Sequence, residues 1–339
     1  MTFAEGGRTL YVTGGRQRSG ALNREEWFSF DRAVCVHLSD AGRMISKLEY
    51  ESPPEACPDS TPSVVFKAGS IAEGRLYLCT QTEVLVYRDG DLTQTAYVSL
   101  PCFNDVHHVA ADARGTIMVA NTGLDMVISM DATGTMLQAW NVIGEEVWDR
   151  FSPDVDYRKM HTTKPHRAHP NFLFELDGRW WVTRFEQRDA VAVGDRRARI
   201  PIGVERPHDG VVVGDKIYFT TVDGHVVIVD WETHEVVEAL DLTELDSSER
   251  ALGWCRGILV EGDYAWVGFT RLRPTAFHTN VSWVKHSFQR VGPHNTRPTR
   301  ISLYDLARRR LVREIDLEPL GLNAVFSLLD GDLGGPRLI

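Results

Sequence analysis

Residues 206–242 read "RPHDGVVVGDKIYFTTVDGHVVIVDWETHEVVEALDL". Four short runs of apolar, β-branched and aromatic residues alternate here with turns that contain Gly or Asp. Residues of the first kind favour strands, and Gly and Asp favour the turns that separate strands. The segment therefore predicts four short strands in succession.

The same pattern recurs along the chain. Four strands in a unit of about 40 residues are typical of a β-propeller blade. A lone strand near the C-terminus completes three strands near the N-terminus, so that the ring has no open sheet edge. We therefore expect an all-β, six-bladed β-propeller as one domain over residues 1–339, with its ring closed by a C-terminal strand that joins an N-terminal blade. The expected blades are 64–100, 105–142, 169–203, 206–242, 255–317 with an insertion at 271–300, and 323–332 together with 8–50.

Composition excludes several classes of protein. The chain has 339 residues, 43% of them hydrophobic, and a net charge of −10, which argues against nucleic-acid binding because that normally needs a basic surface. No apolar run is long enough for a membrane span, and no signal-peptide pattern stands at the start. The five cysteines show no CxxC spacing and suit reduced thiols. We expect a cytoplasmic protein without nucleic-acid or membrane partners, and the oligomeric state stays open.

Polar residues stand where the first strand of each blade begins. In a propeller these strands line the central channel, so their N-terminal ends meet at one mouth. Asn, Asp and His are also ordinary turn residues, and that simpler interpretation stays open. His107 and His108 point to opposite sides of a regular strand, so that at most one of them faces the channel. The segments at this mouth are 66–67, 104–108, 169–171, 206–209, 254–256 and Asn323.

Three of these strand starts carry a family resemblance. "FNDVHHVAADARG" (103–115), "HPNFLFELDGRWWV" (169–182) and "RPHDGVVVGDKIYF" (206–219) resemble, in order and spacing, the Asn-Asp-Gly, Pro-Asn-Gly and Pro-Asp-Gly motifs of the six-bladed regucalcin–gluconolactonase family. The resemblance implies that Asn171 and Asp209 bind a divalent metal and that Asn104 lies close to the metal and the substrate. The family's metal-binding glutamate is missing, because Val65, Phe66 and Lys67 occupy its place.

Histidines would change the chemistry of such a metal site. His108, His169 and His208 stand at the starts of three successive blades and join Asn171 and Asp209 as candidate metal ligands. Oxygen ligands suit Ca²⁺ or Mn²⁺, and imidazoles favour Zn²⁺ or Fe²⁺, so the identity of the metal stays open. Asp209, His108 and His208 are also the candidate catalytic residues, in the role of general base.

Two segments are candidates for a substrate pocket. Residues 154–169 precede the third blade, and residues 271–300 interrupt the fifth with six Lys or Arg and no Asp or Glu. A long loop of this kind is more often a binding loop than a linker, although a solvated basic face or an oligomer contact is the alternative. The positive charges predict a small anionic substrate. The candidate substrate-binding residues are Asn104, Arg184, Arg206, Arg256 and Arg271.

These features favour a metal-dependent enzyme that acts on a small polar, anionic substrate at the mouth of the channel. The resemblance implies lactone or ester hydrolysis, and isomerase or lyase chemistry would use the same groups. One alternative is a propeller that binds a ligand or a protein without catalysis. A second is a histidine-dependent sulfotransferase, because arylsulfotransferases are also six-bladed and the pair His107-His108 resembles their channel residues.

Overall fold

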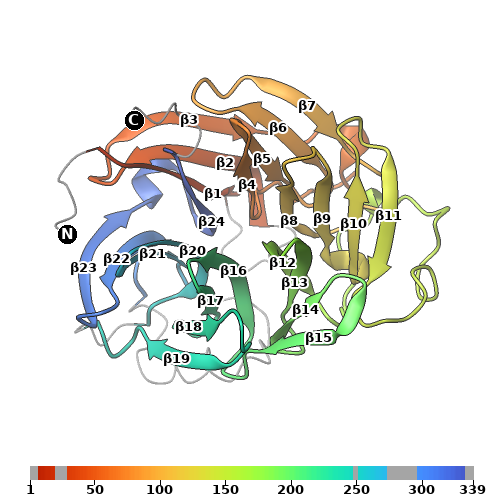
Figure 1. Ribbon diagram of the computed structural model, residues 1–339. Coiled ribbons are helices and arrows are strands. Elements are labelled where there is room, and N and C mark those ends of the chain that lie inside the picture. The colour runs from red at the N-terminus through yellow and green to blue at the C-terminus, as the bar shows by residue number, and fades with distance from the viewer. Residues whose placement is uncertain (1–6, 20–28, 247–250, 273–295, 333–339) are drawn as a thin grey trace.

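The computed structural model describes residues 7–19, 29–246, 251–272 and 296–332. These residues form six four-stranded antiparallel sheets arranged as the blades of a β-propeller (Figure 1). The expected fold class is therefore confirmed. In each sheet the consecutive strands run outward from the channel, so that β4, β8, β12, β16, β20 and β24 are innermost.

The strands of each blade have the following bounds. The first blade contains β4 (Ser70–Ala72), β5 (Arg75–Cys79), β6 (Val84–Arg88) and β7 (Gln94–Val98), and the second contains β8 (Val106–Ala111), β9 (Ile117–Asn121), β10 (Met126–Met130) and β11 (Met136–Asn141). The third contains β12 (Pro170–Leu176), β13 (Arg179–Arg184), β14 (Asp189–Ala192) and β15 (Asp195–Pro201), and the fourth contains β16 (Pro207–Val213), β17 (Lys216–Thr221), β18 (His225–Asp230) and β19 (Val236–Asp241). The fifth contains β20 (Trp254–Glu261), β21 (Tyr264–Thr270), β22 (Arg300–Asp305) and β23 (Arg310–Asp316), and the sixth contains β24 (Ala324–Asp330), β1 (Thr9–Gln17), β2 (Phe30–Ser39) and β3 (Met44–Tyr50).

The sixth blade closes the ring with strands from both ends of the chain. β24 pairs antiparallel with β1, with Leu10 opposite Asp330 and Thr13 opposite Ser327. The Thr13 hydroxyl also lies 2.9 Å from the Ser327 hydroxyl and donates to the carbonyl of Lys67 in the next blade. Closure therefore joins the two ends of the chain and ties them to the first blade.

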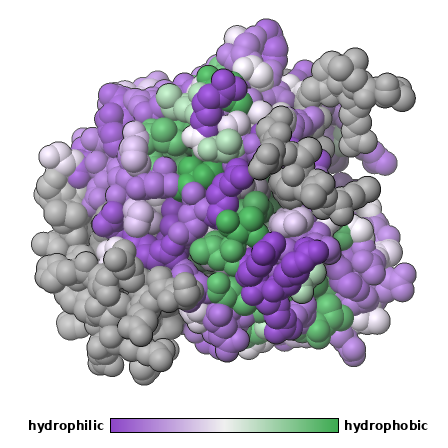
Figure 2. Space-filling view, turned by 90° about the vertical axis from the view of Figure 1, so that its left-hand side faces the viewer, coloured by the Kyte–Doolittle hydropathy of each residue, from purple (hydrophilic) through white to green (hydrophobic). Residues whose placement is uncertain are grey.

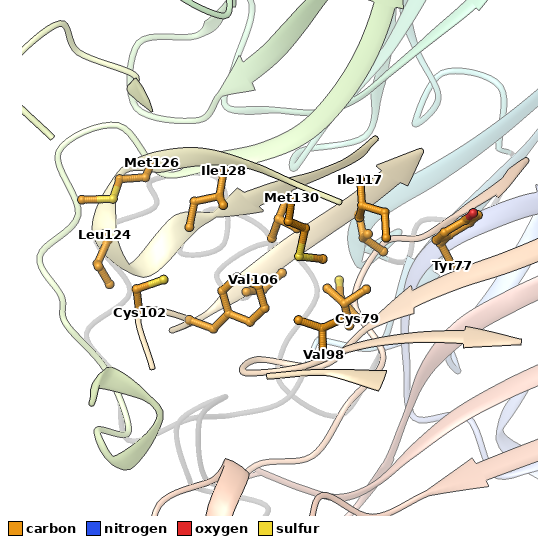
Figure 3. Packing of buried hydrophobic residues seen from close by; sticks show 14 of the residues in the cluster. Tyr77, Cys79, Val98, Cys102, Val106, Ile117, Leu124, Met126, Ile128 and Met130 are labelled. Carbon is orange, nitrogen blue, oxygen red and sulfur yellow. The ribbon is translucent and has the colours of Figure 1, made fainter. Parts of the chain in front are cut away.

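The hydrophobic core lies between blades. One cluster joins Tyr77, Cys79 and Val98 of the first blade to Ile117 and Met130 of the second (Figure 3). Similar clusters lie at each of the other five blade junctions. Because a blade buries its faces only against its neighbours, the ring is expected to fold as a cooperative unit.

One face of the molecule is mostly hydrophilic (Figure 2). Figure 2 shows one side of the molecule, where polar and charged side chains surround smaller groups of hydrophobic ones. Exposed apolar side chains such as Leu137 and Val237 belong to the outermost strands β11 and β19. Within the described residues, no helix has the length and apolar character that crossing a membrane requires.

Candidate functional site

The inner strands bring one side chain or more from every blade to the same mouth of the channel. Lys67 stands ahead of β4, and Asp105 and His107 stand at β8. His169 precedes β12, His208 and Asp209 begin β16, Arg256 lies in β20, and Phe326 lies in β24. These residues are the ones that the alignment of the sequence repeats placed at the mouth, apart from Phe326.

Contacts between neighbouring blades join these side chains. The Lys67 Nζ atom lies 3.6 Å from Asp105 Oδ1 and 4.4 Å from the centre of the Phe326 ring. The Arg256 guanidinium lies 4.8 Å from the centre of the same ring. His107 packs edge-on against His169, with their ring centres 4.7 Å apart. Two cations and two imidazoles therefore come from four different blades.

A second group of rings continues from His169. The Phe185 ring centre lies 4.8 Å from that of His169 and 5.4 Å from that of His208. The Arg206 guanidinium lies 5.5 Å from the same Phe185 ring. His208 and Arg206, both candidate site residues, thus lie beside His169 across one aromatic side chain.

The segment between the second and third blades covers part of this mouth. A narrow pocket with about 10 Å³ of free space, roughly the room for one water molecule, is lined by Lys67, Gln81, Asp105, His107, His161, Thr162, Lys164 and His169. Four of these residues come from the segment 154–169 that the sequence nominated as a pocket builder. The side chains facing this pocket carry two lysines and one carboxylate, so an anion is the favoured ligand.

Asn104 anchors this covering segment. Its side-chain amide donates to the carbonyls of Tyr157 and Met160, both at 2.8 Å, and its backbone N–H donates to Asn121 Oδ1 at 3.0 Å. The side chain is buried. In this arrangement Asn104 supports the pocket wall, and its expected contact with substrate stays a prediction.

The pocket sets the ionisation of its own side chains. Burial opposes ionisation of Asp105, but His107 and Lys67 outweigh this effect and lower its pKa to about 2. Burial lowers the pKa of His169 well below its usual value, and the nearby His107, His166 and Lys164 lower it further. At neutral pH the pocket therefore combines a carboxylate beside Lys67 with a neutral imidazole at His169.

Asp209 begins β16 in an unusual backbone position. Its φ is +65°, and a register shift follows between His208 and Val211. The buried carboxyl accepts hydrogen bonds from the Thr220 hydroxyl and from the Gly257 N–H. Burial raises the pKa of Asp209 to about 7, although these hydrogen bonds and the charge of Arg256 oppose the shift.

His108 does not lie in the pocket. Its Nε2 donates to the carbonyl of Gly69 at 3.1 Å, and its Nδ1 accepts from the N–H of Leu173 at 2.9 Å. The ring stacks on Phe172 at 3.9 Å, and burial lowers its pKa to about 3. The pairing of β8 shifts between Val106 and His108, so that His107 is the extra residue and lines the pocket instead.

Two of the four candidate arginines form ion pairs away from the pocket. Arg184 is buried and makes a two-pronged contact with Asp189, at 2.9 and 2.7 Å. Arg271 makes the same kind of contact with Glu318, at 2.7 Å for both bonds. Residues 273–295 of the basic insertion, with Arg273 and Lys285, lie outside the described residues. Arg206 and Arg256 are the candidates that the structure brings to the mouth.

Within the described residues, the candidate ligands selected from the sequence do not form a metal site. In the described parts of the chain, no three His, Cys, Asp or Glu side chains form a group that could hold a metal ion. Both nitrogens of His108 are engaged in hydrogen bonds with the backbone. Asn171 donates from Nδ2 to Pro207, and its Oδ1 is buried without a hydrogen-bond partner. One orphaned amide oxygen is too little for a metal site, and we derive no chemical step through a metal.

Several residues at the pocket lay in segments that the sequence placed at the mouth or nominated as a pocket wall, but they were not among the candidate site residues. Lys67, Asp105, His107, His161, Lys164 and His166 come together only because the blades and the covering segment meet here. The available signal was the density of histidines in 154–169, which contains His161, His166 and His169.

Comparison with known proteins supports the fold. No family model matches the chain, and no curated protein matches it. A protein of unknown function from Bacteroides caccae is similar in structure, with a TM-score of 0.60, 9% identity, and coverage of 96% of this chain and 99% of that one. A chain of the nidogen/laminin complex gives a TM-score of 0.54 at 8% identity, covering 95% of this chain and 98% of that one. An inactive variant of virginiamycin B lyase from Staphylococcus aureus, with quinupristin, gives 0.45 at 12% identity over 70% of each chain.

None of these three structures is described as a regucalcin or a gluconolactonase. At such low identity the likeness concerns the fold and not the chemistry. The chain is a six-bladed β-propeller.

Proposed function

We propose that the chain is an enzyme that performs acid–base chemistry on a small anionic substrate at the mouth of its channel. The observation that carries the proposal is the presence, in one pocket, of the buried cation Lys67 and the neutral imidazole of His169. A cation buried beside a carboxylate and an aromatic ring favours an anion brought close to it. A neutral imidazole in the same pocket supplies a base.

In this proposal Lys67 and Lys164 bind the anion. Lys67 is 1% exposed and Lys164 lines the same pocket from the covering segment. Both lie near His107 and His169, so a carboxylate or phosphate held by the lysines would place its neighbouring carbon beside the imidazoles. Water is largely excluded around Lys67, and charge–charge attraction is stronger there than on the surface.

The two imidazoles have distinct surroundings. His107 Nδ1 lies 2.8 Å from the carbonyl of Asp105 and 3.5 Å from its carboxylate, so a protonated His107 ring would face a negative charge. His169 has no such carboxylate contact, and its pKa is lowered by burial. We therefore assign His169 as the base and His107 as the acid.

This pair suits β-elimination or isomerisation. His169 would take a proton from the carbon next to the anionic group, the electron pair would form the new double bond, and the bond to the leaving oxygen would break. His107 would give its proton to that oxygen. Opening of a lactone by elimination belongs to this class of reaction, and so does movement of a double bond when no group leaves.

The test begins with ligand binding. We would measure the melting temperature and the heat of binding with a panel of small mono- and dicarboxylates and inorganic phosphate. A panel member that binds the wild-type protein should bind Lys67→Met at least about tenfold more weakly, a loss of about 1.4 kcal/mol. Lys216→Met is the control, because Lys216 pairs with Asp230 in the fourth blade. Equal binding to wild type and Lys67→Met would refute the anion site.

The second step tests catalysis with a pair of matched histidine variants. His169 and His234 both have positive φ, at +56° and +60°, which Asn tolerates. His169→Asn should slow conversion of a bound panel member by about 10²–10⁴, the usual contribution of a general base. His234→Asn should leave the rate unchanged. If ligands bind and are always recovered unaltered, the chain is a binding propeller and the catalytic proposal is wrong.

A further inference from the structure

A chain of hydrogen bonds runs from the pocket into the covering segment. The Thr163 hydroxyl donates to the carbonyl of Gly123, and its oxygen lies 3.5 Å from His166 Nε2. The Nδ1 atoms of His166 and His169 lie 3.2 Å apart. His166 thus stands between Thr163 and the imidazole assigned above as the base.

The direction of these hydrogen bonds follows from counting protons. Thr163 has one hydroxyl proton and gives it to Gly123, so toward His166 its oxygen accepts. A neutral His166 then carries its proton on Nε2 and its lone pair on Nδ1. Because a hydrogen bond needs one donor, His169 must donate from Nδ1. Its lone pair therefore lies on Nε2.

The Nε2 atom of His169 is the ring nitrogen that the hydrogen bond to His166 leaves available. It is shielded from solvent and has no hydrogen-bond partner in the structure, and His169 lines the pocket. A buried polar nitrogen without a partner is costly unless something else occupies the position facing it. A substrate proton would satisfy the lone pair on Nε2.

The backbone around His169 is held by one carboxylate. Asp125 accepts from the N–H groups of Arg167, Ala168 and His169 at 2.8, 2.9 and 2.9 Å, and it pairs with Arg150 at 3.1 Å. Asp125 is buried, so these hydrogen bonds are shielded from water. The carboxylate fixes the backbone of His169, and the ring of His169 packs against His107 and Phe185 and makes its hydrogen bond to His166.

We propose that His166 is a positioning residue that accepts the His169 Nδ1 proton and so keeps the basic lone pair of His169 on Nε2, the ring nitrogen that has no hydrogen-bond partner in the structure. The inference rests on the proposed role of His169 as the base. When Nε2 takes a proton, His169 becomes an imidazolium, and its hydrogen bond to His166 becomes charge-assisted and stronger.

The test reads the tautomer directly, without substrate. In protein labelled with ¹⁵N-histidine, NMR correlations between the ring nitrogens and the protons on the ring carbons show which nitrogen carries hydrogen. The signals of His169 are assigned by their loss in the His169→Asn variant. Wild type should show hydrogen on Nδ1 and a lone pair on Nε2. His166→Ala should yield a mixture of both tautomers. His166→Asn should restore the wild-type pattern, because the Asn side-chain oxygen can accept near the position of Nδ1.

His161→Ala is the matched control. His161 lines the same pocket, but its Nε2 lies 2.6 Å from the Ser60 carbonyl in a different contact, so its loss should leave the His169 tautomer unchanged. A wild-type His169 with hydrogen on Nε2 would overturn the proposal, and so would an unchanged tautomer in His166→Ala. If the tautomer behaves as expected but no panel anion is converted, the proposed function fails while the hydrogen-bond assignment stands.

Discussion

The difference in stability between the Asp209→Asn variant and the wild-type protein should shift in favour of the variant as the pH rises. Asp209 is buried at the start of β16, where its carboxyl accepts from Thr220 and Gly257, and an amide oxygen can accept the same two hydrogen bonds. Asn also tolerates the φ of +65° at this position. The substitution therefore removes the ionisable group and leaves its local geometry in place.

The magnitude follows from the pKa. Burial raises the pKa of Asp209 from 3.8 to about 7, so the unfolded chain releases this proton before the folded protein does. The contribution of protonated Asp209 to the stability of the folded state is therefore fully present below the pKa of the unfolded chain. This contribution is lost as the pH rises through the pKa of the folded protein. At 1.36 kcal/mol for each pKa unit, the loss is about 2 kcal/mol near pH 5 and about 4 kcal/mol near pH 8. The Asp209→Asn protein would show no such loss, because the amide does not titrate.

Urea denaturation of both proteins at several pH values measures this difference. We expect the stability of Asp209→Asn relative to wild type to increase by between about 2 and 3 kcal/mol from about pH 5 to about pH 8. Asp223→Asn is the control of opposite sign, because hydrogen bonds from His225 and Thr221 lower the pKa of Asp223 despite its burial. A difference that does not vary with pH, or that falls as pH rises, would refute the assignment of a raised pKa and would indicate that a positive group or cation holds Asp209 as a carboxylate.

Three further predictions concern closure, a buried acid and metal content. Deletion of residues 324–339 removes β24 and its pairing with β1, so the truncated chain should show no cooperative thermal transition by circular dichroism, and a cooperative melt would contradict ring closure. Glu83 is fully buried and accepts from four hydroxyls, on Tyr50, Ser52, Thr80 and Tyr97. Glu83→Gln keeps one acceptor oxygen, so it should lower the free energy of unfolding by about 2–4 kcal/mol in urea, and unchanged stability would show that the network is not needed. Chelator should leave the wild-type melting temperature unchanged, and stoichiometric metal by elemental analysis would restore the metal-dependent mechanism that the family resemblance implies.

The architecture could be predicted because its signals are local. Each run of residues such as Val226–Val229 carries its own strand preference, and Gly and Asp mark the turns beside it. Repetition of that pattern indicates the number of blades, and the unmatched strand at Ala324–Asp330 predicts the closure that the β1–β24 pairing confirms. The mouth of the channel could be located for the same reason, because every blade begins at the same point of the repeat.

The chemistry of that mouth depended on tertiary contacts. A one-residue register shift in β8 sends His108 into the blade junction and leaves His107 in the pocket, and alternation along a regular strand contains no sign of it. The sequence predicted that Arg184 binds a ligand, whereas the folded structure pairs it with Asp189. The amino-acid sequence by itself determined the blades, their number and the end of the channel where polar residues gather. Only the closed ring decided which of those residues meet, because Lys67, Asp105 and His169 are far apart along the chain and are brought together when the blades close, and the charges of Lys67 and Asp105 interact through distance in space.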